Sequence, residues 1–586
     1  MSVILGLNAY HADAAACLLV NGRLIAAAEE ERFRRIKHWA GFPSQAIAYC
    51  LAEAKLHLSD VEFVALNSDP RANLMRKAVT VLQTRPEPKL IVDRLQNARR
   101  RASVEEELTR AFPAEPFRGK VKRVEHHLAH LGSCFIVSPF HEAVAVSVDG
   151  FGDFSSAAWG LASGQSIEVD GRVYFPHSLG IFYQAITQYL GFPSYGDEYK
   201  VMGLAPYGQP SHLDEMRRIV RTHSDGTFEL NLDYFRHHRE HVPYSWDGGS
   251  PEIGSLYTPE LCELLGPERK PSEPLDDRHR DIARSAQALY EEAFFNLLCR
   301  LHERYACPYV TVAGGCGMNS VANGKISLRT PFRDVYVQAA AGDAGGAIGA
   351  AFIVARQNGC VPARGQMPHA YWGPHYSTQE IAAALRGREA DLERAGCVVE
   401  RVFDDGALCA QTARHVANGE VVGWFQGRME WGPRALGNRS IVCDPRRADM
   451  KDILNLKIKR RESFRPFAPS VLRESVPAWF EQDQNVPFMM QVFQIREDKR
   501  ALIPAVTHVD GSGRLQTVSE DTNPRYHKLI SSFHDLTGVP MVLNTSFNEN
   551  EPVVCKPEEA LDCFLRTKMD VLVMEDFVIT RAREQA

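Results

Sequence analysis

The sequence of 586 residues lacks several features that would place it in a simple class. Its 13 cysteines are odd in number and include no CxxC pair, which argues against a disulfide framework and a zinc ribbon. No run of about 18 apolar residues occurs, so we expect no membrane association. The 67 Lys and Arg against 73 Asp and Glu give a net charge of −6. Because this leaves no global basic field, we expect no nucleic-acid partner, and a bound anion must be met by a local cluster of cations.

The composition is that of an ordinary globular protein. Hydrophobic residues make up 45% and charged residues 24%, which excludes a disordered chain. At about 150 residues per domain, the length predicts two to four domains and excludes a small binding module. Residues 1–19 carry His11 and Asp13 and no basic leader, which favours strands over a signal peptide. With the unpaired cysteines, this indicates a soluble cytoplasmic protein.

Two strand-turn-strand units resemble each other. Residues 3–29 alternate apolar runs with turns, including Asn21-Gly22, and predict a β-meander that ends at a charged helix start. Residues 143–147 enter VDGFGDFSSAAWGLASG, again a strand, a Gly/Asp turn and a second strand. The pattern predicts a duplicated α/β domain whose paired hairpins face a shared cleft.

The order of the remaining segments predicts a two-domain chain. A helix is expected over residues 281–303, followed by strands at 309–313 and 335–338, each running into a glycine turn and a helix. We expect a first domain over 1–357 with a polar insertion at about 209–277, which either covers the cleft or holds an acceptor. A Gly/Pro-rich linker over 358–374 and an α/β or α+β domain over 375–586 follow. That domain should have a helix over 378–396 and strands near Val398, Val421, Val542 and Val571.

Four side chains are candidates for a metal site. His126 and His130 in EHHLAH are four residues apart, so on a helix both imidazoles lie on one face. Alone, such a pair is more often solvated or capping. Asp149 at a strand end and Asp343 in a glycine turn complete a set of two nitrogens and two oxygens, which suits iron, manganese or zinc more than magnesium alone. Open coordination positions would leave room for phosphate.

The glycine turns indicate a nucleotide-binding fold that is neither a P-loop nor a Rossmann fold. The turns at 314–317 and 342–346 lack the Walker Lys-Ser/Thr and do not match GxGxxG. Glycine would let backbone amides approach a phosphate or nucleoside at a helix N-terminus. The alternative is a pair of tight turns that bind nothing.

Cations concentrate in the C-terminal half of the sequence. They are interleaved with Gly, Pro, Trp and Phe, which favours a structured polyanion pocket over a solvated face; the pocket would suit a nucleoside triphosphate or an acyl phosphate. The cations are Arg428, Arg434, Arg439, Lys457, Lys459, Arg461, Arg465 and Arg514. Asn544 and Ser546 in LNTSFN add neutral donors. In the first hairpin, His11 beside Asp13 is either structural or a general base for a hydroxyl.

The motifs together resemble one family over nearly the whole chain. The sequence contains, in order, GLNAYHADAA, EERFRRIKH, EHHLAH, VDGFGD, YGDEYKVMGLAPYG, GGCGMN, GDAGGAIGAA, GRMEWGPRALGNRS, FRPFAPS and NTSFN. In this it is similar to the NodU/CmcH-type O-carbamoyltransferases. The resemblance implies an N-terminal ASKHA domain (actin, sugar kinase, heat-shock chaperone) and a C-terminal YrdC-like domain.

The resemblance also implies a reaction. In such enzymes the YrdC-like domain converts carbamoyl phosphate and ATP, with Mg²⁺, to carbamoyladenylate, phosphate and pyrophosphate. The ASKHA domain then passes the carbamoyl group to an acceptor hydroxyl and releases AMP. The resemblance implies His126, His130, Asp149 and Asp343 as the ligands of a metal, iron in this family, and His11 as the base.

The nucleotide and substrate contacts follow from the same resemblance. The implied nucleotide contacts of the N-terminal domain are Gly314, Gly315, Asn319, Gly345 and Gly346. Lys200, with Glu198, is a further nucleotide contact or a hinge and core residue. The implied pocket for carbamoyl phosphate and ATP consists of Arg434, Lys459, Arg465, Arg514 and Ser546.

Three other functions remain open at this point. A non-catalytic ASKHA module would hydrolyse ATP slowly without carbamoyl phosphate. A sugar kinase of the same superfold would yield ADP, not AMP. A fused threonylcarbamoyl enzyme acting on tRNA should need a basic surface to bind the RNA, which the net charge of −6 disfavours. The sequence names no acceptor, so sugars, aminoglycosides, cephems, polyketides and lipochitooligosaccharides all stay possible, as does a homodimer.

Overall fold

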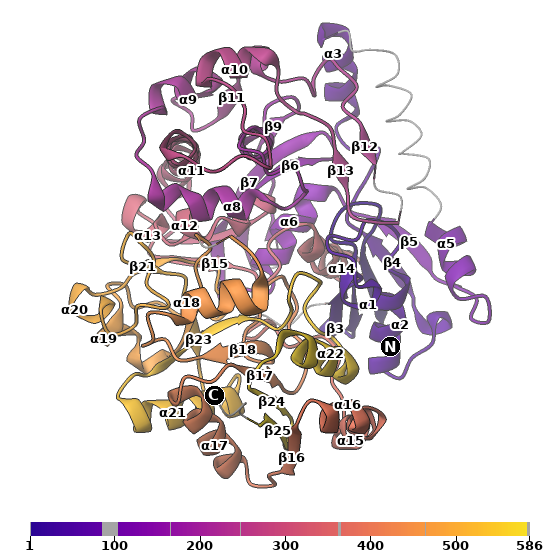
Figure 1. Ribbon diagram of the computed structural model, residues 1–586. Helices are drawn as coiled ribbons and strands as arrows, with labels where there is room; N and C mark the ends of the chain where they lie inside the picture. Colours follow the sequence, from indigo (N-terminus) through magenta and orange to yellow (C-terminus); the bar gives the residue numbers. More distant parts are fainter. Residues whose placement is uncertain are drawn as a thin grey trace. The chain divides into compact units, whose positions relative to one another are not determined.

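The computed structural model describes residues 2–84, 104–164, 166–245, 248–360, 365–462 and 464–582 (Figure 1). Contacts divide the chain into two compact units, unit 1 (Met1–Met367) and unit 2 (Pro368–Ala586). Within the described ranges, no helix is both long enough and apolar enough to cross a membrane.

The first sheet of unit 1 opens with an antiparallel meander of β1, β2 and β3 and continues with β4 and β5, which run parallel to β1. Its strands are β1 (Val3–Asn8), β2 (Ala15–Val20), β3 (Arg23–Glu29), β4 (Phe63–Leu66) and β5 (Lys120–Arg123). Asn21 and Gly22 both have positive φ, 51° and 73°, as a tight two-residue hairpin turn requires. The expected meander is confirmed.

The second sheet repeats this plan. Strand β6 pairs antiparallel with β7, β7 pairs antiparallel with β8 and β9, and β14 and β15 extend the other side of β6 in parallel. The strands are β6 (Glu142–Gly152), β7 (Ser155–Ser163), β8 (Ser166–Ile167), β9 (Gly171–Tyr174), β14 (Tyr309–Ala313) and β15 (Asp334–Val337). Both sheets therefore consist of a meander followed by two parallel strands, which confirms the expected duplication.

Two helices with glycines at their contacts join the sheets. Helix α14 (Asp343–Gln357) packs against β1 and against α6 (His126–Phe135). A Cβ added to Gly349 of α14 would lie 1.8 Å from the backbone oxygen of Ala129 in α6, and one added to Gly6 of β1 would lie 2.2 Å from the oxygen of Ala347. The backbones approach so closely that no larger residue fits at these two positions.

Most other elements of unit 1 are helices around these sheets. They are α1 (Glu31–Arg34), α2 (Ser44–Glu53), η1 (Leu58–Asp60), α3 (Leu74–Thr84), α5 (Val104–Ala111), α7 (Leu179–Tyr189), α8 (Glu198–Leu204), η2 (Ala205–Tyr207), α11 (Asp277–Tyr305), η4 (Gly315–Met318), α12 (Ser320–Asn323) and α13 (Ile326–Arg329). Helix α11 confirms the long helix expected over 281–303.

The segment expected as an insertion has secondary structure of its own. It contains α9 (Leu213–Ile219), β10 (Val220–Thr222), β11 (Phe228–Leu230), η3 (Leu232–Tyr234), β12 (Tyr244–Ser245), β13 (Glu252–Ile253) and α10 (Pro259–Leu265). Its four strands form two small antiparallel sheets, and α9 packs on α11. The role of this segment stays a prediction.

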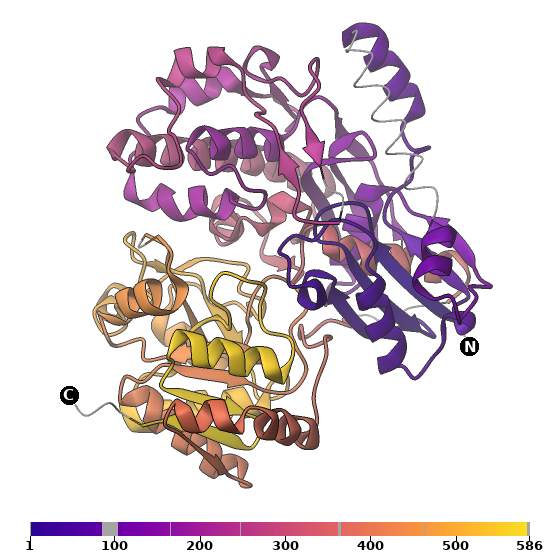
Figure 2. The ribbon, with the colours of Figure 1, turned by 45° about the vertical axis from the view of Figure 1, so that its right-hand side comes forward.

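Unit 2 is built on one mixed sheet of eight strands, in the order β16-β25-β24-β17-β18-β23-β19-β22. The orange and yellow elements in Figure 2 form one body around it. The strands are β16 (Cys397–Arg401), β17 (Val422–Phe425), β18 (Arg439–Cys443), β19 (Ala468–Leu472), β22 (Gln516–Val518), β23 (Met541–Ser546), β24 (Val571–Met574) and β25 (Phe577–Arg581). Strands are thus confirmed at all four expected places, and with unit 1 this gives a mixed α/β chain.

Helices pack on this sheet, with α17 against α21 and α15 against α22. The remaining elements of unit 2 are α15 (Thr378–Gly387), α16 (Glu389–Arg394), α17 (Asp405–Ala417), α18 (Met450–Ile453), the π-helix η5 (Leu454–Lys459), η6 (Arg473–Ser475), α19 (Val476–Trp479), α20 (Glu497–Arg500), α21 (Pro524–Thr537), α22 (Pro557–Thr567) and the strand pair β20 (Phe493–Gln494) and β21 (Ser512–Gly513). The expectation of a single helix over 378–396 is wrong. The chain leaves helical geometry at Arg388 and forms two helices, α15 and α16.

The expected linker over 358–374 is only partly described, since residues 361–364 lie outside the described ranges. Its last residues are tied to unit 2: the amide of Gly373 donates to the oxygen of Met429 at 2.9 Å, and the amide of Met429 donates to the oxygen of Pro374 at 2.8 Å.

Gly349→Ala tests the close contact between α6 and α14. The added methyl group should force the two helices apart and lower the free energy of unfolding by about 1–3 kcal/mol, measured by chemical denaturation. Gly249→Ala is the control, because a Cβ there would meet nothing within 4 Å among the described residues, and it should change stability by less than about 0.5 kcal/mol. Equal effects of the two substitutions would show that the helix contact is not tight.

Candidate metal centre and anion pocket

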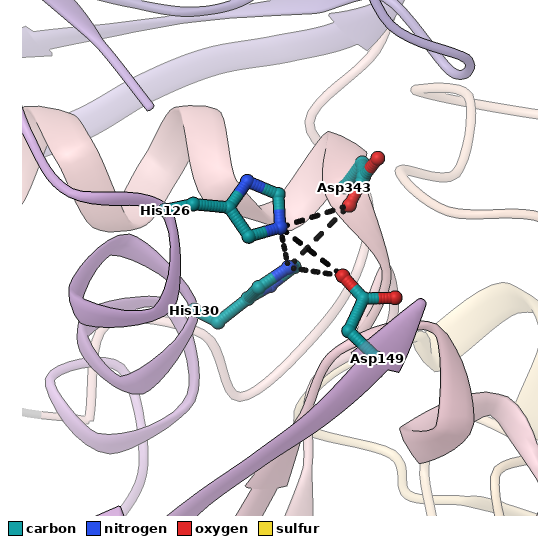
Figure 3. A group of neighbouring side chains, drawn as sticks. All are labelled: His126, His130, Asp149 and Asp343. Atoms are coloured by element: carbon teal, nitrogen blue, oxygen red, sulfur yellow. Dashed lines mark hydrogen bonds and ion pairs between the residues drawn. The ribbon is translucent and has the colours of Figure 1, made fainter. Parts of the chain in front are cut away.

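Four side chains from three elements of unit 1 converge on one point (Figure 3). His126 and His130 lie one turn apart on α6, Asp149 lies near the end of β6, and Asp343 is the first residue of α14. The metal set expected from the sequence is therefore brought together by the contact of α6 with α14 and by the second hairpin.

The spacing of the donor atoms suits a single cation. The Nε2 atoms of His126 and His130 lie 3.0 Å apart, and each lies 3.1 Å from Oδ2 of Asp149. Oδ1 of Asp343 lies 3.6 Å from Nε2 of His126 and 3.4 Å from Nε2 of His130. Ligands about 2.1 Å from a metal in a tetrahedral shell are about 3.4 Å from one another. The donor types and their separations fit a divalent transition metal.

Burial and charge are balanced within this group. Burial alone would lower the pKa of His130, but its hydrogen bonds to the carboxylates of Asp149 and Asp343 raise that pKa to about 9. Burial would likewise raise the pKa of Asp149, but the hydrogen bonds from His126 and His130 hold it well below its usual range. Asp149 is thus held ionised in a buried place, where it attracts a cation.

His127 does not belong to the group. Its Nδ1 lies 2.9 Å from the hydroxyl of Ser147, and burial, followed by the charge of His126, lowers its pKa to about 3. Of the two adjacent histidines, His126 is therefore the one that faces His130 and the aspartates.

His11, the expected base, lies beside the metal group. Its ring centroid is 6.1 Å from that of His126. The loop that carries it, between β1 and β2, is held by the side-chain amide of Asn8, which donates to the oxygens of Ala12 and Asp13. Asp13 in turn accepts a hydrogen bond from Nδ1 of His38 at 2.9 Å, so the loop is fixed at both ends.

The first glycine turn touches the metal group. The amide of Gly315 donates to Oδ1 of Asp149 at 3.0 Å. Gly314 has φ +88°, and a Cβ there would lie 2.2 Å from the oxygen of Val148. The side chain of Asn319 caps α12 at Ala322 and exchanges hydrogen bonds with Gln287, so in this structure it supports the turn.

The second glycine turn is closely packed. A Cβ on Gly345 would lie 2.1 Å from the oxygen of Ala340, and one on Gly346 would lie 2.5 Å from Nδ2 of Asn67. Both glycines therefore allow the first turn of α14 to pack against neighbouring segments. Their expected role as nucleotide contacts stays a prediction.

Lys200 and Glu198 lie at the start of α8. The ammonium group of Lys200 pairs with Asp197 at 2.9 Å and lies over the ring of Phe192 at 5.3 Å. Burial raises the pKa of Glu198 to about 7. Lys200 is thus tied to its own helix start, an arrangement typical of a hinge or core residue, and its role as a nucleotide contact stays a prediction.

In unit 2, four arginines form a cluster. Burial, followed by the positive charges of Arg434, Arg461 and Arg465, holds the pKa of the Arg514 guanidinium well below its usual range. All four arginines are half-buried, and like charges gathered in such a place repel one another unless an anion lies between them. Four of the cations that the sequence indicated for the pocket, Arg434, Arg461, Arg465 and Arg514, are therefore neighbours. The side chain of Lys457 lies outside the described residues.

Lys459 and Ser546 form a second group. Nζ of Lys459 donates to the oxygen of Ser546 at 2.5 Å and to the oxygen and Oδ1 of Asn548 at 2.8 and 2.7 Å. The side chain of Lys459 is buried, and its contacts fix the turn that follows β23. In this structure Lys459 is therefore a support of the Ser546 turn.

Two residues that the implied pocket for carbamoyl phosphate and ATP did not include lie beside it. Arg461 contributes to the pKa shift of Arg514 and was visible in the basic stretch. His508 has its pKa lowered to about 4, by burial first, while Asp510 opposes the shift and Arg514 adds to it. Its signal was its position six residues before Arg514.

Comparison with known proteins places the chain in a family. Residues 3–352 match the Carbamoyltransferase N-terminus and residues 413–581 the Carbamoyltransferase C-terminus. The chain therefore belongs to the carbamoyltransferase family, as its motifs indicated, and is a transferase of carbamoyl groups.

Three relatives illustrate the breadth of the family. An uncharacterized Synechocystis protein, sll1178, is 39% identical over 100% of this chain and 97% of its own length. Nodulation protein NolNO of Sinorhizobium fredii is 38% identical over 98% of this chain and 80% of its own. The 3'-hydroxymethylcephem-O-carbamoyltransferase of Amycolatopsis lactamdurans is 36% identical over 41% of this chain and 42% of its own.

Substitution of the metal group tests whether it binds an ion. His130→Gln should reduce the metal that copurifies or can be loaded, measured by elemental analysis, by more than about 10-fold, since even outer-shell substitutions cost about 10–100-fold in affinity. His127→Gln is the control, because His127 is an adjacent buried imidazole bonded to Ser147; with folding checked by circular dichroism, it should leave the metal content unchanged. Equal metal loss in both variants would contradict the assignment.

The pair of Asp13 and His38 predicts a pH dependence. Burial lowers the pKa of His38, but Asp13 raises it to about 9 from 6.5. Because the folded-state pKa is raised, this pair stabilises the fold fully below about pH 6.5, and its contribution is lost as the pH rises through 9. Asp13→Asn should return the pKa, measured by NMR of labelled histidine, towards 6.5 and remove that part of the pH dependence of unfolding.

Glu115→Gln is the control for this experiment. Glu115 forms a similar pair with His57, at 3.1 Å, elsewhere in unit 1. Its loss should leave the titration of His38 unchanged. A wild-type pKa near 6.5 for His38 would contradict the pairing with Asp13.

Proposed function

We propose that the chain is an ATP-dependent O-carbamoyltransferase that forms carbamoyladenylate in unit 2 and transfers the carbamoyl group in unit 1 to a hydroxyl of a small-molecule or sugar-containing acceptor. The observation that carries the proposal is the half-buried Arg514 with three arginines beside it. Membership of the carbamoyltransferase family supplies the group that is transferred.

In unit 2 the proposed substrates are carbamoyl phosphate and ATP with its Mg²⁺. Water cleaves carbamoyl phosphate to carbamate and phosphate. A carbamate oxygen then bonds to the α-phosphorus of ATP, and pyrophosphate leaves. Arg434, Arg465 and Arg514, with Arg461, bind and orient the phosphates and stabilise the charge that develops on them. Lys459 and Ser546 belong to the proposed pocket through the turn that they form together.

In unit 1, His126, His130, Asp149 and Asp343 would hold a divalent metal, for which the family resemblance favours iron. Such an ion supplies Lewis-acid polarisation and a seat for a phosphate oxygen. His11 accepts the proton of the acceptor hydroxyl, whose oxygen bonds to the carbamoyl carbon while the bond from that carbon to the phosphate oxygen breaks and AMP leaves. The turn of Gly314 and Gly315, with the start of α14, is the proposed seat of the nucleotide.

The proposal also assigns folds and boundaries. The ASKHA superfold is proposed for residues 1–357, and the repeated strand order of its two sheets supports it. A YrdC-like domain is proposed for residues 375–586, joined by a linker over 358–374. The absence of a nucleic-acid partner, a cytoplasmic location and a homodimer stay predictions of the sequence.

Isotope exchange tests the proposal without an acceptor. Labelled pyrophosphate should enter ATP only when carbamoyl phosphate is present, because exchange requires a reversible adenylate. Arg434→Ala and Arg514→Ala should each slow exchange by about 100-fold or more, as removal of one group that stabilises a developing anion does. Arg473→Ala is the control, since Arg473 pairs with Asp483 at the surface, and it should exchange like the wild type. Accumulation of ADP without exchange would favour a kinase or ATPase and contradict the role of the pocket.

A further inference from the structure

We propose that Glu430 is a positioning residue that holds Arg434 in the anion pocket by fixing both ends of the loop that carries it. The inference rests on the proposed function of that pocket. It assigns to a carboxylate, in a site that binds anions, a role in placing a cation.

Glu430 closes the loop between β17 and β18. Its side chain is only 3% exposed. Its Oε1 accepts hydrogen bonds from three backbone amides, those of Leu436 at 2.7 Å, Asn438 at 2.8 Å and Arg439 at 3.1 Å. Residues 431–435, which include Arg434, therefore form a short loop whose two ends are joined through one carboxylate oxygen.

The same loop is tied on both sides of Arg434. The amide of Trp431 donates to the oxygen of Ala370 at 2.6 Å. The oxygen of Ala435 accepts from Nδ2 of Asn544 at 3.1 Å. The oxygen of Leu436 accepts from Nε2 of Gln516 at 2.7 Å and from the hydroxyl of Tyr371 at 2.8 Å. Glu430 is the charged member of this set and makes three of its bonds.

A fixed loop is needed because the pocket repels its own members. Arg434, Arg461 and Arg465 each disfavour the charge on Arg514. A flexible loop would let Arg434 move away from the others whenever no anion is bound, and binding would then have to bring it back at a cost in affinity. Hydrogen bonds from amides to a carboxylate are among the stronger ones in proteins, so Glu430 opposes that movement.

The second oxygen of the Glu430 carboxylate determines which substitutions are informative. Oε2 of Glu430 is buried and has no hydrogen-bond partner among the described residues. In Glu430→Gln the amide oxygen can keep the three bonds, while the amide nitrogen meets no acceptor. Glu430→Gln should therefore weaken anion binding only in part, whereas Glu430→Ala should show the full effect.

Two measurements on the full chain test the proposal: calorimetric binding of inorganic pyrophosphate, and hydrogen exchange of residues 436–439. Glu430→Ala should lose amide protection in that segment and weaken pyrophosphate binding by about 10–100-fold, as expected when hydrogen bonds to a charged group are lost. Glu430→Gln should weaken it by less than 10-fold. Arg434→Ala should weaken it as much as Glu430→Ala.

The double variant separates positioning from general stability. If Glu430 acts through Arg434, then Glu430→Ala should add little, less than about 3-fold, to the effect of Arg434→Ala, because residues of one network are not additive. Glu559→Ala is the matched control: Glu559 accepts from the amides of Cys555 and Lys556 at the start of α22 in the same unit. It should leave pyrophosphate binding unchanged.

Three results would overturn the proposal. Unchanged pyrophosphate binding in Glu430→Ala would do so, as would fully additive effects in the double variant or an equal loss in Glu559→Ala. A wild-type protein that neither binds pyrophosphate nor exchanges it into ATP would instead overturn the proposed function of the pocket, and with it this role of Glu430. If Glu430→Ala does not fold, Glu430→Gln with and without Arg434→Ala gives the same comparison.

Discussion

The close approach of α6 and α14 is the constraint on which the candidate metal centre depends. Gly349 lets the α14 backbone reach that of Ala129, and Gly6 lets β1 reach α14. This contact brings the start of α14, with Asp343, to the two imidazoles of α6. The second hairpin then needs to supply only Asp149. A site drawn from both halves of a duplicated domain is thus set by backbone packing, which is stiffer than any single side chain.

The two units differ in the charges that their candidate sites bring together. Unit 1 places two carboxylates with two imidazoles, and unit 2 places the half-buried Arg514 beside three other guanidinium groups. A ligand that binds only the folded form stabilises that form. A cation should therefore stabilise unit 1 and an anion unit 2.

Local patterns in the sequence predicted much of this arrangement. The Asn-Gly turn, the HxxxH spacing and the strand ends at Asp149 and Asp343 each follow from short-range geometry, and the structure brings these side chains together. Contacts between residues distant in the sequence could not be predicted in this way. Nothing near Lys459 in the sequence shows that its amine meets Ser546 and Asn548. Nothing near Glu430 in the sequence shows that its carboxylate accepts from the amides of Leu436, Asn438 and Arg439, because a buried polar partner is visible only once the chain has folded.

The division of the proposed reaction between units follows from the chemistry of each site. Formation of an adenylate would move negative charge among phosphates, and the described part of unit 2 gathers guanidinium groups around Arg514. Transfer to a hydroxyl requires a proton acceptor beside a bound phosphate, and unit 1 places His11 next to the metal group. A guanidinium cannot accept that proton, because it stays charged at any ordinary pH. Cations close to a base lower its pKa and weaken it as a proton acceptor. A pocket of four guanidinium groups is therefore a poor place for that base, and the two steps are suited to separate units.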